Sequence, residues 1–159
     1  METVTSDSDK VTMSSKALLE ACREGDLNKV KQALLDGADI LHHDDEGWTA
    51  IIVSCYYKNF KICSFLLQTL NGDKRLFNQK TNDGFTALHH ACAFCPADIV
   101  MRIAEKSEVN EVNKNGKTPI FEAVSYNNLA AARAMMFEVK GVNINHKNND
   151  GKSIEDNAW

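Results

Sequence analysis

The chain has few prolines and glycines, no long apolar run and no excess of basic residues. Its 159 residues include two prolines and eight glycines, which argues against a low-complexity or wholly disordered chain. No apolar run approaches the roughly 18–20 residues that a membrane-spanning helix needs, so we expect no membrane insertion. The net charge of −4 gives no support to nucleic-acid binding, which normally shows a basic surplus.

The N-terminal residues also lack the apolar stretch that is typical of a secretion signal. Residues 1–13 are polar and acidic, and we expect them to form a disordered tail. Five cysteines without a secretion signal indicate reduced thiols and an intracellular location, in the cytoplasm or the nucleus. The hydrophobic fraction of 43% is enough to form a core.

Related segments recur along the chain at a nearly constant spacing. The segments GWTAIIVSC, GFTALHHAC, GKTPIFEAV and GKSIEDNA begin at Gly47, Gly84, Gly116 and Gly151, which are 37, 32 and 35 residues apart. The segment SSKALLEAC, which begins 33 residues before Gly47 at Ser14, fits the same frame. Such a period predicts a stack of repeats in which neighbouring units bury a shared core.

Each unit reads as two short helices joined by turns rich in Asp, Asn and Gly. The first helix, for example Ala87–Phe94, follows a Thr that can cap free backbone N–H groups, and Pro119 is suited to a first helical position. Gly37 stands where a left-handed residue would end a second helix. The second helices show apolar spacing on one face, in Leu27, Val30 and Leu34 and again in Leu129, Ala132 and Met136.

The consensus G-x-T-P-L-H-x-A-A, followed by a helix ending L-L-x-x-G-A-D, resembles the ankyrin repeat. It appears here as GFTALHHAC, GKTPIFEAV, GWTAIIVSC and LLDGADI. The resemblance implies an all-α solenoid of helix–turn–helix units with short β-hairpin fingers, about four repeats plus a partial fifth. The predicted units are an N-terminal cap repeat 14–46, repeat 2 at 47–83, repeat 3 at 84–115, repeat 4 at 116–150 and a partial repeat or cap 151–159.

Two departures from the pattern are informative. The 37-residue spacing predicts an insertion of about four residues within 71–78. The last unit is short and carries Glu155 where an apolar residue belongs, so it is either a capping stub or part of a longer protein.

Two motifs suggest chemistry that the repeat register explains better. Neither GKT at 116–118 nor GKS at 151–153 has the first glycine of a phosphate-binding loop. The segment HHACAFC offers soft zinc ligands, but His89 and His90 point about 100° apart on a helix. The resemblance assigns His89 to hydrogen bonding within and between repeats and Cys92 to an apolar slot, while Cys95 could be an exposed, oxidisable thiol. We expect no catalytic residues, metal or cofactor.

The resemblance also implies a partner-binding face, formed by variable finger residues and by residues that follow the Ala-Cys pair. Six of these residues are aromatic, and Tyr and Trp often anchor interfaces. We expect Phe85 and Phe94 to fold back onto neighbouring repeats. The finger charges run from −3 at 44–46 to +2 in the third finger, a field that would orient a partner. The candidate residues are Asp45, Glu46, Trp48, Tyr56, Tyr57, Asp83, Phe85, Phe94, Lys114, Lys117 and Tyr126.

These patterns favour a monomeric, non-catalytic module that binds a protein or peptide partner. The alternatives are the targeting or regulatory arm of a longer enzyme or channel, an ankyrin stack that inhibits a kinase, and a metal or redox protein centred on Cys92 and Cys95.

Overall fold

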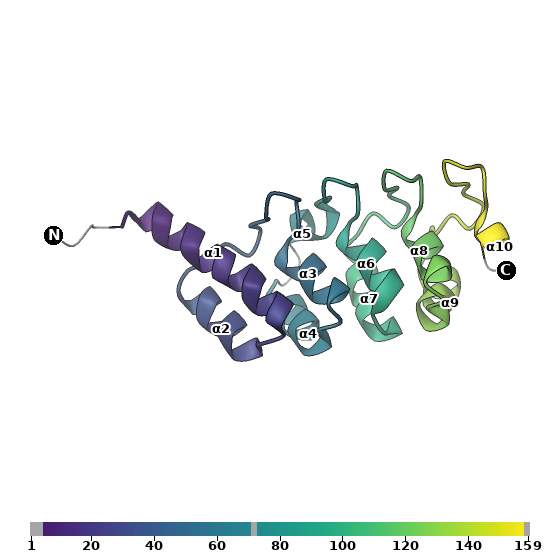
Figure 1. Ribbon diagram of the computed structural model, residues 1–159. Helices are drawn as coiled ribbons and strands as arrows, with labels where there is room; N and C mark the ends of the chain where they lie inside the picture. Colours follow the sequence, from purple (N-terminus) through teal and green to yellow (C-terminus); the bar gives the residue numbers. More distant parts are fainter. Residues whose placement is uncertain (1–4, 71–72, 158–159) are drawn as a thin grey trace.

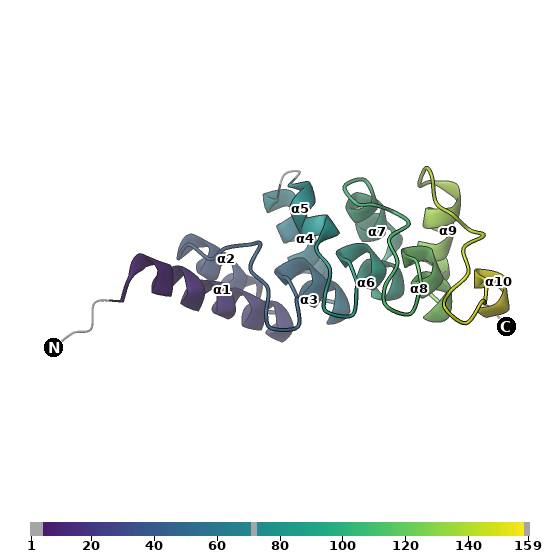
Figure 2. The ribbon, with the colours of Figure 1, turned by 90° about the horizontal axis from the view of Figure 1, so that it is seen from above.

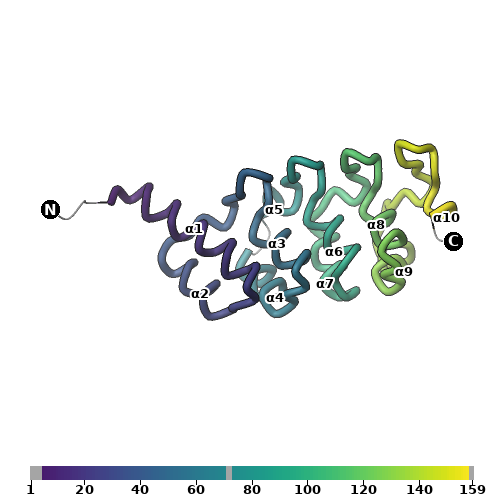
Figure 3. The backbone as a smooth tube through the Cα atoms, viewed as in Figure 1, coloured from purple at the N-terminus to yellow at the C-terminus, as the bar shows by residue number. Residues whose placement is uncertain are grey.

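Pairs of short helices are stacked in one row, and the loops between pairs project on the same side (Figures 1 and 3). The computed structural model describes residues 5–70 and 73–157, which contain ten α-helices. The pairs are α1–α2, α3–α4, α6–α7 and α8–α9 (Figure 2). The bounds are α1 (Asp7–Glu24), α2 (Leu27–Leu35), α3 (Ala50–Tyr56), α4 (Phe60–Thr69), α5 (Lys74–Asn78), α6 (Ala87–Phe94), α7 (Ala97–Ala104), α8 (Pro119–Ser125), α9 (Leu129–Phe137) and α10 (Ile154–Asn157).

The first helix of each inner pair is buried on nearly every side, because first helices pack on one another along the row. Residues 50–55 of α3 and 87–93 of α6 are all buried. The second helices bury only one face, as α7 does through Ile99, Val100 and Ile103. The core is therefore a series of thin apolar layers between neighbours, as the repeat spacing predicted.

Asparagine side chains tie successive pairs together at the tight turn between helices. The Nδ2 group of Asn59 donates to the Cys22 carbonyl at 2.6 Å. Asn128 holds the equivalent place two repeats later and donates to the Cys92 and Cys95 carbonyls at 3.0 and 2.8 Å. Each bond satisfies a carbonyl at the end of a first helix that has no partner within its own helix.

The fingers are linked by one backbone hydrogen bond at each step. The amide of Asn82 donates to the Glu46 carbonyl at 2.8 Å, and that of Lys114 donates to the Asp83 carbonyl at 2.9 Å. Gly84 (φ +81°) makes this approach possible, since a Cβ there would lie 3.0 Å from the Cα of the next finger's Asn113. Among the described residues, bridge pairing occurs only between His43 and Thr49, so the fingers are tight turns with little regular β-structure.

His89 has the role that the family resemblance implied. Its Nδ1 accepts from the Thr86 amide at 3.1 Å, so Nε2 carries the proton and donates to the Lys117 carbonyl of the next repeat at 3.0 Å. Burial lowers the pKa of His89 to about 4, which keeps the ring neutral.

The disordered tail expected for residues 1–13 is wrong for Asp7–Met13, which form the first turns of α1. Ser6 begins this helix with a capping box, in which its hydroxyl accepts from the Asp9 amide and its own amide donates to the Asp9 carboxylate. Residues 1–4 lie outside the described residues. The insertion predicted within 71–78 corresponds to α5. Residues 71 and 72 of that segment lie outside the described residues.

Two local predictions are also wrong. The hydroxyls of Thr49 and Thr118 cap no backbone amide, although Pro119 does stand at the first position of α8. On α9, Leu129 and Met136 are exposed, and the buried face is turned so that small alanines and one methionine fill it. The left-handed residue expected at Gly37 is confirmed, with φ +88°.

Candidate partner-binding surface

Aromatic rings from three successive repeats form one continuous cluster, here called the aromatic cluster. Trp48 and Tyr56 meet with ring centroids 5.0 Å apart, Tyr56 and Phe94 at 5.4 Å, and Phe94 and Tyr126 at 4.9 Å. Edge-to-face geometry at these distances is attractive beyond the burial of area alone. The members are Trp48, Tyr56, Tyr57, Phe85, His90, Phe94 and Tyr126.

His90 lies at the centre of the aromatic cluster and was not among the predicted site residues. Its ring is stacked on Phe85 at 5.0 Å and on Phe94 at 6.3 Å, and it meets Trp48 at 5.0 Å. Burial lowers the pKa of His90 to about 3, and its Nε2 has no hydrogen-bond partner. The sequence did indicate that His90 points elsewhere than His89, because successive residues of a helix are about 100° apart around its axis.

The exposure of the six predicted rings divides them into two groups. Tyr56, Tyr57 and Tyr126 are 44, 49 and 56% exposed. Trp48, Phe85 and Phe94 are half-buried, and Trp48 also packs against the hydrophobic core. Phe94 contacts both neighbouring repeats as expected, whereas Phe85 packs on His89 and His90 of its own repeat.

A cavity of about 180 Å³ opens among these rings. Two carboxylates, those of Asp83 and Glu122, join the rings in its wall. Glu122 is buried and accepts one hydrogen bond, from the Asn113 side chain at 3.0 Å. Burial raises the pKa of this carboxyl. The cavity therefore has apolar walls and a few polar groups with unused hydrogen-bonding capacity, the usual make-up of a binding pocket.

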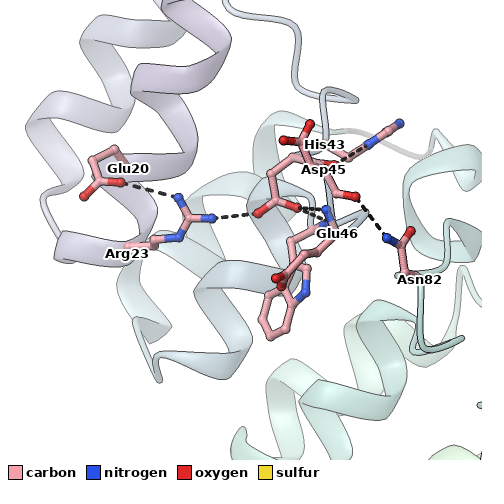
Figure 4. A network of polar contacts seen from close by, with 8 residues as sticks. Glu20, Arg23, His43, Asp45, Glu46 and Asn82 are labelled. Atoms are coloured by element: carbon pink, nitrogen blue, oxygen red, sulfur yellow. Dashed lines mark hydrogen bonds and ion pairs between the residues drawn. The ribbon is translucent and has the colours of Figure 1, made fainter.

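The first finger is held by a network of polar contacts (Figure 4). The guanidinium of Arg23 joins Glu20 at 3.4 Å to Asp44 at 2.7 Å, and the other carboxylate oxygen of Asp44 accepts from the amides of Glu46 and Trp48. The charge of Asp44 is therefore compensated, and the −3 expected for this finger is reduced. The side chains of the predicted residues Asp45 and Glu46 remain exposed.

Charges on the later fingers are also paired with their neighbours. Lys114 lies 4.0 Å from Asp83 of the preceding finger, and Lys80 pairs with Glu111. The ammonium of Lys117 donates to the neutral Ser125 hydroxyl at 3.2 Å and keeps its charge. The two ion pairs weaken the charge gradient that the sequence suggested, and the aromatic cluster is the more continuous feature of this face.

A second grouping lies inside the stack. The Sγ atoms of Cys55, Cys63 and Cys95 all lie within 4.8 Å of one another, and all three residues are buried. The expectation of an exposed Cys95 is wrong, because the residue is 2% exposed. The group contains Cys95 but not Cys92, the other residue of the metal or redox alternative. Spacings of 8 and 32 residues carry no recognisable metal motif, so this group appears only once the repeats are stacked.

None of the helices formed by residues 5–70 and 73–157 is long and apolar enough to cross a membrane.

Comparison with known proteins agrees with the observed stack of helix pairs. The family model described as "Ankyrin repeats (3 copies)" matches residues 18–110 and 74–148. This chain belongs to the ankyrin-repeat family. Ankyrin repeats are generally protein–protein interaction modules and are typically non-catalytic.

Two relatives are similar to this ankyrin chain. YahD of Escherichia coli (strain K12), named as an ankyrin repeat protein, is 29% identical in an alignment that covers 69% of this chain and 70% of YahD. The B-cell lymphoma 3 protein homolog of Mus musculus is 25% identical over 126 residues, which is 78% of this chain but 28% of that protein.

Proposed function

We propose that this chain is a non-catalytic module that binds a protein or peptide through the face formed by its fingers and first helices. The observation that supports this most is the aromatic cluster, in which three half-exposed tyrosines stand on a layer of packed rings. Tyrosine supplies large, rigid contact area at little cost in side-chain entropy and is enriched among residues that dominate binding energy.

The cavity beside these tyrosines indicates how a partner is held. Rings of Trp48, Phe85 and Phe94 line it, and these would surround an apolar or amphipathic side chain inserted by the partner. The carboxyl of Glu122, which accepts a single hydrogen bond within the chain, offers a second one to a polar tip on that side chain. The remaining predicted residues, Asp45, Glu46, Asp83, Lys114 and Lys117, would form the polar rim.

A double substitution, Tyr57→Ala with Tyr126→Ala, tests the proposal. These rings are the most exposed members of the aromatic cluster, so their loss removes contact area without opening the core. Trp48→Ala is less suitable, because this ring packs on the core. Phe137→Ala is the matched control, since Phe137 is 75% exposed on α9, outside the cluster.

The assay is affinity capture from a lysate of the source organism, quantified by mass spectrometry. We expect a set of proteins retained by the wild type and by Phe137→Ala but lost with the double variant, while the thermal stability of all three is similar. Equal capture by the double variant would show that the aromatic cluster does not bind the partner.

Within the same proposal the chain is a monomer and works in the cytoplasm or nucleus. The five cysteines support this location, because all of them are free and buried and so suit a reducing compartment. Sedimentation equilibrium tests the monomer, and fluorescence microscopy of a tagged chain tests the location.

A second candidate function is the targeting arm of a longer protein. The match to the mouse relative favours it, because this chain spans only 28% of that protein. The transcript beyond the codon for Trp159 decides the matter: an open reading frame supports it, and a stop codon removes it.

A further inference from the structure

Three cysteine side chains converge in the core between the second and third repeats. Cys55 comes from the C-terminal half of α3, Cys63 from α4 and Cys95 from the residue that ends α6. The Sγ atoms of Cys55 and Cys63 are 3.9 Å apart, and all three sulfurs lie within 4.8 Å of one another. We propose that these three sulfurs form a binding site for one Cu(I) ion in trigonal geometry.

The distances suit a metal held by three sulfurs. With metal–sulfur bonds of about 2.3 Å in a plane, the sulfurs lie about 4.0 Å apart. The 3.9 Å separation of Cys55 and Cys63 already matches this spacing. Two sulfurs joined in a disulfide lie about 2.05 Å apart, so the observed separation is nearer to that of two sulfurs on a shared metal.

The set of ligands decides which ion fits. Thiolate ligands select Cu(I), zinc or iron–sulfur clusters, and structural zinc takes four ligands in a tetrahedron. In the described part of the chain, no fourth Cys, His, Asp or Glu joins the group. Cys55 and Cys63 are fully buried and Cys95 is 2% exposed, which disfavours water as a fourth ligand. A soft ion that is stable with three sulfur ligands meets these conditions.

Binding also releases protons, because a metal ion is held by thiolates and not by thiols. Three thiols that bind one Cu(I) ion lose three protons, and the positive charge of the ion offsets one of the three negative charges that remain. The affinity for Cu(I) should therefore increase with pH.

The site would join the second and third repeats, whose helices α3 and α6 pack on each other. Cys55 and Cys63 lie in the second helix pair, and Cys95 follows the first helix of the third pair. A bound ion would therefore hold the two pairs together. Because an ion that binds only the folded chain stabilises it, bound Cu(I) should raise the melting temperature.

The test is an anaerobic titration of the reduced full chain with Cu(I) against a chromophoric Cu(I) chelator. We expect one tightly bound ion per chain, a higher melting temperature, and three sulfur neighbours in the X-ray absorption spectrum of the wild type. Cys63→Ala and Cys95→Ala should each weaken binding by at least about 100-fold. Cys22→Ala and Cys92→Ala remove equally buried thiols outside the group and should retain the affinity.

Three outcomes would overturn the proposal. The first is a titration without a one-to-one endpoint, the second is full affinity in Cys63→Ala, and the third is a disulfide with a mass loss of about 2 Da in place of a bound ion. Should the alanine variants fail to fold by circular dichroism, the sulfur count of the wild type still decides the question, because any count other than three contradicts a trigonal site.

Discussion

Asn128 should contribute more to stability than its surface position suggests. It lies at the start of α9, where its Nδ2 donates to the carbonyls of Cys92 and Cys95 in the preceding repeat. Its Oδ1 accepts from the Ala131 amide at 3.3 Å and so caps its own helix. The substitution Asn128→Ala removes all three hydrogen bonds and leaves two carbonyls at the end of α6 without this donor.

The magnitude follows from the count of these bonds. A hydrogen bond contributes roughly 0.5–1.5 kcal/mol net, so three bonds amount to about 1.5–4.5 kcal/mol. For a chain of this length each kcal/mol shifts the melting temperature by about 2–4 °C, which predicts a decrease of about 3–18 °C.

The location of the effect is the sharper part of the prediction. Since repeats contact only their neighbours, weakening the boundary between the third and fourth repeats should loosen α8 and α9 first. Urea unfolding gives the free energy of unfolding, and hydrogen exchange with mass spectrometry shows which helices lose protection. Asn28→Ala is the control, because Asn28 is exposed on α2 and should change stability by less than about 0.5 kcal/mol.

Two results would refute this reasoning. One is a loss of stability no larger than that of Asn28→Ala, which would mean that water replaces the bonds at no cost. The other is an equal loss of protection in α1 to α4, which would mean that the stack unfolds as one unit.

Two further predictions concern the turns and the buried histidines. Lys58 has φ +59°, so Lys58→Gly should relieve backbone strain and raise the free energy of unfolding by about 0.5–1 kcal/mol. Asn127→Gly should give a smaller gain, because Asn tolerates a left-handed conformation better than Lys does. A urea midpoint for Lys58→Gly at or below that of the wild type would contradict this prediction. Burial lowers the pKa of His89 to about 4 and of His90 to about 3, so the unfolded chain binds more protons below its histidine pKa of about 6.5. The free energy of unfolding should therefore be highest above about pH 6.5 and decrease as the pH falls toward 4. His90→Phe should make this dependence on pH less steep in urea unfolding measured from about pH 7.5 to about pH 4.5. An equally steep dependence in the variant would show that His90 does not cause it.

The sequence predicted the repeated elements well because each prediction was supported by several copies. The bounds of α6, Pro119 at the start of α8 and the left-handed Gly37 were all found as expected. The first turns of α1 were missed because their residues are polar and exposed, so they carry no apolar pattern. The capping-box spacing of Ser6 and Asp9 was a usable signal for this helix start.

The candidate site was predictable in position but not in packing. The repeat register placed Tyr56, Tyr57 and Tyr126 on one face, and they are exposed there. The register could not show that His90 fills the space between Phe85 and Phe94, because that depends on ring contacts within and between repeats. The cysteine group was unpredictable for the same reason, since its members are adjacent only after stacking.

The short helix α5 shows how the stack accommodates additional length. It lies between α4 and the second finger, where it buries Leu76 and Phe77. Even so, the next finger amide, that of Asn82, still reaches the Glu46 carbonyl at 2.8 Å. The extra residues at this point are therefore accommodated outside the row of fingers. The spacing between the second and third units along the surface of the proposed binding face is set by the finger-to-finger hydrogen bonds and not by the 37 residues of chain between Gly47 and Gly84.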